Sequence, residues 1–594
     1  MKINDRISAL RSGLLANKID AVIIPSGDPH QSEYMADHWQ SRAWASGFTG
    51  SSGTVVITHD HAGLWTDSRY FIQAVQQLEA SDFVLHRLLI PHTAQHLDWL
   101  VEKLEPKSVV AVDGYMFSHQ QLEKMKDQFA NRDIELKTDL DLIPSAWKDR
   151  PKLPQTSILE LSADQVGQSR ASKIQAIRTK MVENNSDHLV VTTLDDLCWI
   201  LNFRGNDVEN NPLTIAYLII HEDRCSLFID AEKLTVGIIG TLDAESIQIF
   251  PYENIQDHLS RIDSNQRVWI NPATINGPLH DAIIAKKYEA ELPSTLMKAL
   301  KNETEVKFTR SAMQKDGVAL VHLWRWLELT IQQRSVTEVE VAEKLIEFRA
   351  QQGDYHGESF PAIVGYQGNG AIVHYRAEPE TCASIKPEGI LLLDSGGQYL
   401  QGTTDITRTV ALGPCSKEQQ KHFTLVLKGH IALDTVVFPT GTPGRNVDVL
   451  ARAPLWKAGL NYGHGTGHGV GFFLNVHEGP QGISGADSAK TRHAIMPGMI
   501  TSNEPGFYLE NQYGIRIENL VLCKKHEDPT FEGFLNFETL TLFPIDLNLI
   551  DMDILNEEEI NWLNNYHQLV YDKLSPSLDA QHQDWLREKC GLGE

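Results

Sequence analysis

The sequence has few cysteines and no long apolar run, and these two absences exclude several classes of protein. Its six cysteines are scattered over 594 residues without a C-x-x-C pair. A disulfide framework or a cysteine-rich zinc cluster needs closer spacing, so we expect reduced thiols. No apolar run approaches the roughly 20 residues that span a bilayer. Charged residues also interrupt the N-terminal segment, where a signal peptide would have an apolar core. We therefore expect a cytoplasmic protein without a membrane partner.

Basic side chains are also in short supply relative to acidic ones. Lys and Arg number 53 and Asp and Glu number 78, which gives a formal net charge of −25. Such a chain repels nucleic-acid phosphates and anionic lipids, so we expect no nucleic-acid partner. Solubility accounts for most of the carboxylates, and the question is whether a few of them take part in chemistry. The length predicts about three to five domains.

The first half of the chain repeats one α/β pattern. Thr54–Asp67 (TVVITHDHAGLWTD) has the pattern of strand, turn and strand, and Ala216–Asp230 (AYLIIHEDRCSLFID) resembles it, with Asp230 lying 163 residues after Asp67. Chance similarity between two ordinary strand hairpins is the alternative. Two prolines in Asp149–Ser157 indicate a boundary. The sequence thus predicts two related α/β domains, at 1–152 and 153–304.

The remainder, 305–594, alternates helices with apolar strands and holds most of the unusual residues. A long helix is expected to begin within Lys301–Ala312, with Thr304 as its cap, and to continue through Gln332. A helical tail is expected from about 552. In this tail Asn556 precedes a capped amphipathic helix that packs on a neighbouring element or a partner subunit. The predicted fold class is a mixed α/β (α+β) chain.

Two aspartates flank a glycine-rich turn in GILLLDSGGQYLQGTTDITRTVAL. We expect Asp394 to end an apolar strand and Asp405, 11 residues later, to open the next. The two carboxylates would then lie near one end of a buried sheet, where an isolated charge is too costly unless it is paired or binds a cation. Aspartates beside a turn are more commonly turn formers, so this segment alone leaves a metal site and a simple turn as alternatives.

Three histidines lie in the glycine-rich segment NYGHGTGHGVGFFLNVHEGP. They are His464, His468 and His477. The alternating glycines argue against a helix and favour a backbone that passes close to a ligand or metal. A flexible polar loop is the alternative.

Further polar candidates lie in SNEPGFYLENQYGIRIENLVL. The turn after Glu504 fixes the direction of that side chain, and Arg516 and Glu518 are expected to share one face of a strand. This pair is either a metal ligand with its charge-matched neighbour or a surface salt bridge. Two more candidates are isolated, and such residues are more commonly structural: His374 in IVHYRAEP and Arg69 in WTDSRYF.

The candidate ligands in chain order are Asp, Asp, His, Glu and Glu. Four carboxylates and one imidazole form an oxygen-rich set that suits two divalent cations sharing carboxylates. Four negative charges would balance two dications, and a two-metal site can hold a hydroxide at neutral pH. The ligands do not distinguish Mn²⁺, Co²⁺ and Zn²⁺, and we expect Mn²⁺ first.

These motifs resemble those of a known family. DSGGQYLQGTTDITRT, HGTGHGVG, NEPGFY and GIRIEN resemble, in order, the motif blocks of the pita-bread metallopeptidases, the group of methionine aminopeptidase, prolidase and aminopeptidase P. PSGDPHQSEY, WTDSRYF, LNFRGNDVENNP and the tail extend the resemblance over the whole chain to the long, three-domain, cytosolic aminopeptidase P type. The resemblance implies a C-terminal pita-bread catalytic domain after the two related N-terminal domains.

The resemblance also implies residue roles. Asp394 would hold one metal, His468 and Glu504 the other, and Asp405 and Glu518 would bridge both. The remaining implied roles concern substrate and proton transfer: Glu504 accepts the proton of the attacking hydroxide, His374 and His477 contact the scissile carbonyl region and the intermediate, Arg516 lies near Glu518, His464 lines the pocket, and Arg69 contacts substrate from the N-terminal domain.

The resemblance implies a metal-dependent exopeptidase that releases the N-terminal residue from peptides with proline in the second position and that works as a homodimer. A prolidase, which cleaves only Xaa-Pro dipeptides, is one alternative. Chain length and the duplicated N-terminal half favour the aminopeptidase. A catalytically silent peptide-binding module is the other alternative, and the five intact ligand positions argue against it.

Overall fold

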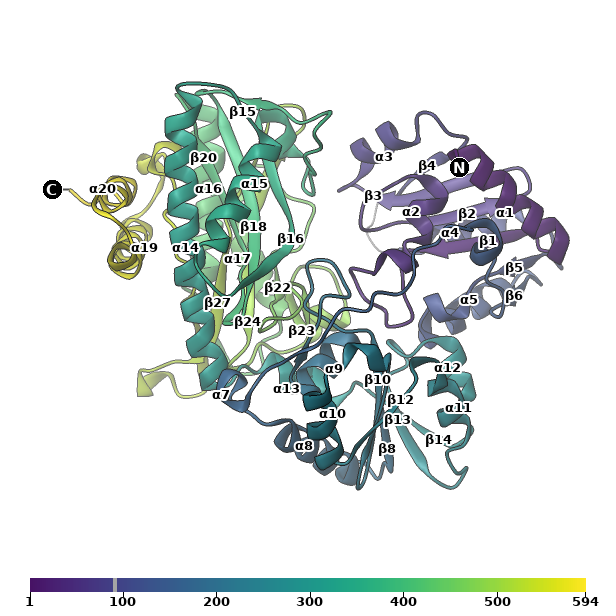
Figure 1. Cartoon of the computed structure of the whole chain (residues 1–594). Coiled ribbons are helices and arrows are strands. Elements are labelled where there is room, and N and C mark those ends of the chain that lie inside the picture. Colours follow the sequence, from purple (N-terminus) through teal and green to yellow (C-terminus); the bar gives the residue numbers. More distant parts are fainter. Residues whose placement is uncertain (89–92, 594) are drawn as a thin grey trace. The chain divides into compact units, whose positions relative to one another are not determined.

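The computed structural model describes residues 1–88 and 93–593, which form two compact units (Figure 1). The first unit comprises Met1–Ala163 and Gln168–Ser294, and the second comprises Asp164–Gly167 and Thr295–Glu594. Within the described ranges, no helix has both the length and the apolar character needed to cross a membrane.

Two six-stranded sheets in the first unit share one topology. The first has the order β4-β3-β2-β1-β5-β6 and the second β12-β11-β10-β8-β13-β14. Equivalent strand pairs have the same direction in both sheets. The strands β3-β2-β1 and their equivalents β11-β10-β8 pair antiparallel, and all other neighbours pair parallel. The predicted repeat of two related α/β domains is therefore confirmed.

The strands of these sheets have the following bounds: β1 (Ala21–Pro25), β2 (Thr54–Thr58), β3 (Ala62–Asp67), β4 (Val84–Leu88), β5 (Val109–Ala111), β6 (Glu135–Lys137), β8 (His188–Val191), β10 (Ala216–His221), β11 (Cys225–Ile229), β12 (Ile247–Phe250), β13 (Arg267–Ile270) and β14 (Lys286–Glu289). The main helices are α1 (Ile3–Asn17), α3 (Phe71–Leu78), α4 (Gln95–Lys103), α5 (His119–Ala130), α8 (Arg170–Glu183), α9 (Leu194–Leu201), α10 (Val236–Ala244), α11 (Ile255–Ser260) and α12 (Gly277–Ala282).

Helices cover both faces of the first sheet, which explains why its central strand is a continuous apolar run. In β1, Val22 and Ile24 join one apolar cluster, whereas Ala21 and Ile23 join another on the opposite face. Successive side chains of a strand point to opposite faces, so a strand buried on both sides needs apolar residues at every position.

The second unit is built on two sheets. One contains β16 (Tyr355–Tyr366), β18 (Ile390–Tyr399), β19 (Gly402–Thr403) and β20 (Ile406–Ala411). The other has the order β21 (Phe438–Pro439), β28 (Phe534–Thr539), β27 (Asn519–Lys525), β24 (Ile500–Asn503), β22 (Gly467–Gly469) and β23 (Glu478–Ile483). A hairpin of β25 (Gly506–Leu509) and β26 (Tyr513–Arg516) precedes β27. The main helices are α14 (Glu303–Ile331), α15 (Glu338–Ala350), α16 (Lys417–Asp434), α17 (Gly444–Lys457), α19 (Glu557–Leu574) and α20 (Ala580–Lys589).

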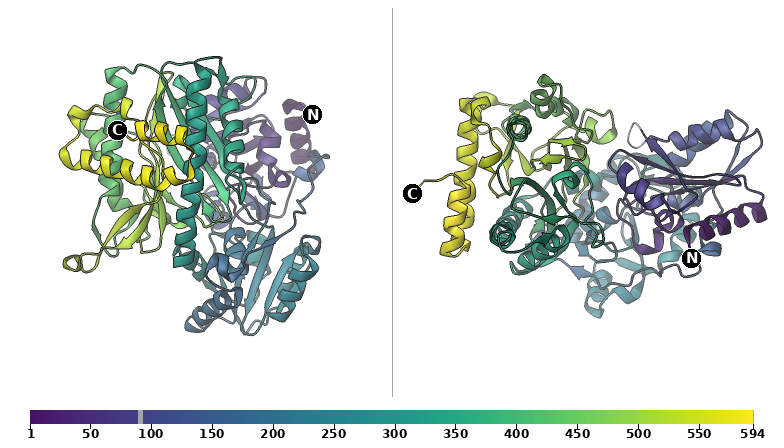
Figure 2. Two further views of the ribbon diagram at one scale, coloured as in Figure 1. Left: turned by 60° about the vertical axis from the view of Figure 1, so that its left-hand side comes forward. Right: turned by 90° about the horizontal axis from the view of Figure 1, so that it is seen from above.

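The tail helix α19 forms as expected, with Asn556 as its N-cap and Glu559 completing the capping box. It lies beside α20 and packs on α14 and α16 (Figure 2). Its buried Tyr566 hydroxyl accepts a hydrogen bond from Arg408 Nη2 at 2.8 Å and contacts Asn519 Oδ1 at 3.3 Å. The tail thereby reaches the back of β20 and β27.

Two expectations about local structure are wrong. Asn302, not Thr304, caps α14: its side chain accepts from the amides of Thr304 and Glu305, so Thr304 lies in the first turn. Asp394 does not end its strand, because β18 continues through Gly396 to Tyr399 and stays paired with β16. A Cβ on Gly396 would lie 2.0 Å from the Thr404 carbonyl oxygen, so glycine permits this close approach.

Candidate metal centre

In the second unit, the paired strands β18 and β20 bring Asp394 and Asp405 to one region. Asp394 lies opposite Thr407 in the pairing of β18 with β20, and Asp405 directly precedes β20. Both residues are buried, at 8% and 3% relative exposure. The predicted neighbouring strands form, but Asp405 lies one residue before β20 and does not open it. The turn between the two aspartates comes later than expected.

The neighbouring strands β22 and β24, in the other sheet of the second unit, position His468 and Glu504. His468 is the central residue of β22, and its amide donates to Ser502 Oγ of β24 at 2.9 Å. Glu504 directly follows β24, and its amide donates to the Thr466 carbonyl at 2.8 Å. A Cβ on Gly467 would lie 2.0 Å from the Ser502 carbonyl oxygen, so this glycine of the loop serves close strand contact.

Glu518 joins the two sheets. Its amide donates to the Thr407 carbonyl at 3.1 Å, and its Oε2 accepts from Thr407 Oγ1 at 2.7 Å. The expectation that Arg516 and Glu518 share a strand is wrong, because β26 ends at Arg516 and β27 begins at Asn519. Both side chains nevertheless lie buried beside Thr407.

The side chains converge from these elements. His468 Nε2 lies 3.4 Å from Asp405 Oδ2 and 3.8 Å from Glu504 Oε1. Asp405, His468 and Glu518 each offer a ligand atom within 4.8 Å of the others. Asp394 belongs to the same cluster, because its charge acts on both Asp405 and Glu518. The structure therefore brings all five candidate ligands together.

Burial and the crowding of carboxylates disfavour the ionised forms of these side chains in the absence of a cation. Burial, and then the charge of Asp394, raise the pKa of Asp405 well above its usual range. Burial, and then the charge of Asp405, do the same for the pKa of Glu518. Burial, and then the charge of Glu518, raise the pKa of Glu504 to about 8. Divalent cations would reverse this effect by pairing with the charges.

Two carboxylate oxygens in the cluster support the fit of a metal. Asp394 Oδ1 and Glu518 Oε1 are buried, and neither has a hydrogen-bond partner. A buried oxygen without a partner is costly unless a cation or water coordinates it. With four carboxylates and one imidazole, the donor set fits two divalent ions that share ligands.

Arg516 supports this cluster from a fully enclosed position. It is 2% exposed, which excludes the surface salt bridge. Its Nη2 donates to Asp394 Oδ2 at 2.6 Å and its Nε donates to Thr407 Oγ1 at 3.2 Å. The arginine therefore pairs directly with Asp394 and reaches Glu518 only through the Thr407 hydroxyl.

Sequence reasoning missed the linking roles of Thr407 and Tyr508. Thr407 lies in β20, two residues after Asp405, and residues two apart in an extended chain point to the same side, a signal that the spacing offered. Tyr508 lies in the hairpin strand β25. Its hydroxyl accepts from Arg516 Nη1 at 2.6 Å and lies 2.8 Å from His464 Nε2, so it connects the arginine to the histidine loop.

The remaining candidates differ in how closely they approach the cluster. The His477 ring stands perpendicular to the His468 ring, with centroids 4.3 Å apart. His374 is half-buried and follows Val373, whose carbonyl lies 3.5 Å from Arg516 Nη2. Arg69 lies in the first unit, where its Nη2 donates to Asp67 Oδ2 at 2.7 Å.

Comparison with known proteins places these features in a family context. A model of metallopeptidase family M24 matches residues 307–525, and a model of the C-terminal region of this peptidase family matches residues 533–592. Two models described as creatinase/prolidase N-terminal domains match residues 6–140 and 149–305. The matches thus extend over both units.

Relatives are similar over nearly the whole chain. Aminopeptidase P2 of Arabidopsis thaliana is 41% identical over 96% of this chain and 85% of its own length. A probable Xaa-Pro aminopeptidase P of Laccaria bicolor is 40% identical over 99% of this chain and 93% of its own. The crystal structure of X-prolyl aminopeptidase from Caenorhabditis elegans, described as a cytosolic enzyme with a di-nuclear active site, is 34% identical and covers 99% of both chains with a TM-score of 0.94.

Proposed function

The chain belongs to metallopeptidase family M24. We propose that it is a metal-dependent exopeptidase that releases the N-terminal residue from peptides with proline in the second position. The convergence of five metal-ligand side chains, two of which have buried oxygens without partners, carries the catalytic part of this proposal. Whole-chain similarity to proteins named Xaa-Pro aminopeptidase supports the substrate class and favours it over the dipeptidase.

The proposed cofactor is a pair of divalent ions, with Mn²⁺ preferred over Co²⁺ and Zn²⁺. Asp394 would bind one ion, His468 and Glu504 the other, and Asp405 and Glu518 both. The description of the nematode enzyme as di-nuclear supports two ions. When bound, such ions acidify a water molecule and polarise the peptide carbonyl.

The chain's own residues orient the substrate and move protons. Glu504 is proposed to accept a proton from the attacking water, which fits its position beside His468 at the edge of the cluster. His477 and His374 are proposed to contact the scissile carbonyl region, and the packing of His477 on His468 supports this role. Arg516 holds the Asp394 carboxylate in place. The His464 side chain is proposed to line the pocket.

Other parts of the proposal rest on the family. Domain boundaries after residues 152 and 304 are supported by the positions of the family matches. A substrate contact by Arg69, a homodimer and a cytosolic location are proposed on the same basis, and the nematode relative is described as cytosolic. The substrates are peptides with an N-terminal Xaa-Pro sequence.

A metal-series assay tests the function. Chelator-treated protein is supplied with Mn²⁺, Co²⁺ or Zn²⁺ and given Xaa-Pro-Yaa tripeptides and Xaa-Pro dipeptides. We expect release of Xaa from the tripeptides with at least one metal and none without metal. Release from dipeptides alone would favour the prolidase. Intact tripeptides under every metal would favour the binding module.

A further inference from the structure

The two N-terminal domains meet through the starts of two equivalent helices. Helix α5 follows β5 and precedes β6, and α12 follows β13 and precedes β14, so each has the same place in its domain. The helix caps Ser118 and Asn276 form a β-bridge with one another. The His119 amide donates to the Ile275 carbonyl at 2.8 Å. This backbone contact fixes the first turns of the two helices next to each other.

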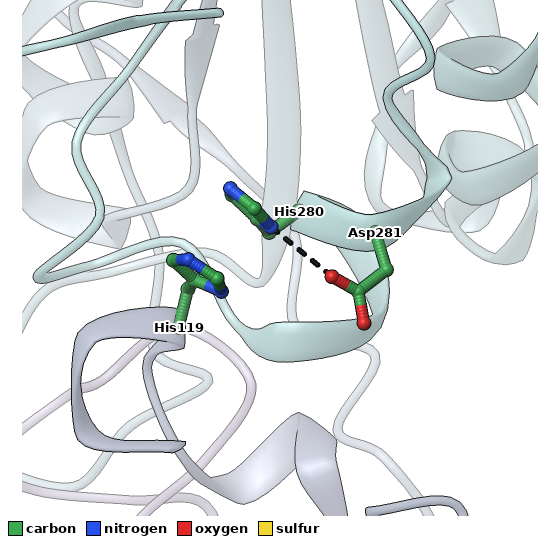
Figure 3. Close-up of side chains that lie close together, drawn as sticks. All are labelled: His119, His280 and Asp281. Carbon is green, nitrogen blue, oxygen red and sulfur yellow. Dashed lines mark hydrogen bonds and ion pairs between the residues drawn. The ribbon is translucent and has the colours of Figure 1, made fainter. Parts of the chain in front are cut away.

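Three side chains of the types that bind metals gather at this junction (Figure 3). His119 begins α5, whereas His280 and Asp281 lie in α12. The two imidazole rings stack with centroids 3.3 Å apart, and His280 Nδ1 lies 3.1 Å from Asp281 Oδ1. All three residues offer a ligand atom within 4.8 Å of the others. A tetrahedral zinc ion with bonds of about 2.0–2.1 Å holds its ligand atoms roughly 3.3 Å apart, and the 3.1 Å between His280 Nδ1 and Asp281 Oδ1 suits one ion.

The surroundings of His280 suit a metal-bound imidazole. Besides the contact of Nδ1 with Asp281, its Nε2 lies 3.4 Å from Glu289 Oε1. With a metal ion between Nδ1 and Asp281, the Nε2–H group would donate to Glu289. A carboxylate is the usual outer partner of a metal-bound histidine.

We propose that His119, His280 and Asp281 bind one divalent transition-metal ion that joins the two N-terminal domains. Two imidazoles and a carboxylate suit zinc, copper or nickel better than magnesium or calcium. Asp281 is exposed, so water can supply a fourth ligand. Because the rings are nearly parallel, at 13°, the half-buried His119 ring turns about its side-chain torsion to aim at the shared ion.

Counting bound zinc in the full-length protein tests this site. The wild type, His280→Gln and a control, His258→Gln, are stripped with chelator, reloaded with zinc, desalted and measured by mass spectrometry. His258 is a suitable control because it lies in the same domain and packs on Phe228 and Phe250. We expect the wild type and the control to retain one more zinc per chain than His280→Gln, whatever number other sites hold. Equal numbers in all three proteins would overturn the proposal.

A second variant guards against a folding defect. The Asp281 side chain is 65% exposed, so Asp281→Asn should leave the fold intact, which circular dichroism checks. We expect the zinc affinity of the additional site to fall at least about tenfold in competition with a chelator. Unchanged affinity would remove Asp281 from the site. Wild-type binding of the additional ion only at millimolar zinc would reduce the observation to adventitious surface binding and overturn the proposal.

Discussion

Replacing Glu504 with glutamine is expected to stabilise the metal-free protein while it abolishes turnover of the loaded one. In the metal-free cluster the pKa of Glu504 rises from 4.5 to about 8, chiefly because the side chain is buried and also because Glu518 lies nearby. An acid whose folded pKa exceeds its unfolded pKa loses stabilising free energy as pH rises between the two values. For Glu504 this window runs from pH 4.5 to about 8.

The magnitude follows from the width of that window. Each pH unit within it costs about 1.4 kcal/mol, so at pH 7 the ionisable Glu504 lowers the free energy of unfolding by about 3 kcal/mol. The Glu504 side chain is only 20% exposed, so solvent screens this effect little. Glutamine keeps the shape and does not titrate. For a unit as large as the second one, which holds this cluster, about 3 kcal/mol corresponds to roughly 5 °C in the temperature of the unfolding midpoint.

Calorimetry of chelator-treated protein at pH 4.5 and pH 7 measures the effect. The transition of the second unit, which holds this cluster, is the one that moves upward when Mn²⁺ is added. We expect Glu504→Gln to unfold about 5 °C above the wild type at pH 7 and at the same temperature at pH 4.5. The control is Glu510→Gln, an exposed carboxylate in the neighbouring hairpin, which should change little. With metal added, Glu504→Gln should lose at least about 100-fold in turnover. Equal midpoints for wild type and variant at pH 7 would refute the argument that burial and the neighbouring carboxylates disfavour ionisation of Glu504.

Three further substitutions test other parts of the site. Asp405→Asn should abolish tripeptide turnover with the fold kept, and near-normal turnover would show that the bridging role is wrong. Thr407→Val removes the hydroxyl between Arg516 and Glu518 and should lower kcat by about 10–100-fold, with recovery in Thr407→Ser; no difference between the two variants would assign Thr407 a packing role only. Tyr566→Phe should lower the free energy of unfolding by about 1–3 kcal/mol in calorimetry, since it leaves buried polar groups unsatisfied. An unchanged midpoint would show that water replaces the hydroxyl.

The sequence was sufficient for the features that local patterns encode. The tandem domains were visible in two similar strand hairpins, and the tail helix in its capping box. The cap of α14 was readable too, because Asn302 and Glu305 form the same box, which favoured Asn302 over Thr304. The motifs predicted which residues make up the candidate metal cluster. The assembly of these residues into one site is a property of the folded chain.

Features that depend on contacts between distant parts of the chain could not be predicted from the sequence. Asp394 lies within a strand because β16 continues to pair with β18 past this residue. The break between Arg516 and Asn519 likewise depends on which strands β26 and β27 pair with. His119 and His280 lie far apart in the chain, and each alone resembles an ordinary surface histidine. Only the junction of two homologous helices brings them together.

The contact of Tyr566 with the back of β20 and β27 has a consequence for the order of events during synthesis. Ribosomes build the chain from the N-terminus, so all five candidate ligands emerge before α19 does. Until then, Arg408 and Asn519 lack the hydroxyl that they contact in the folded protein. The strands that carry Asp405 and Glu518 thus acquire their final support late, and a nascent chain gains its full catalytic framework only after the tail helix has docked.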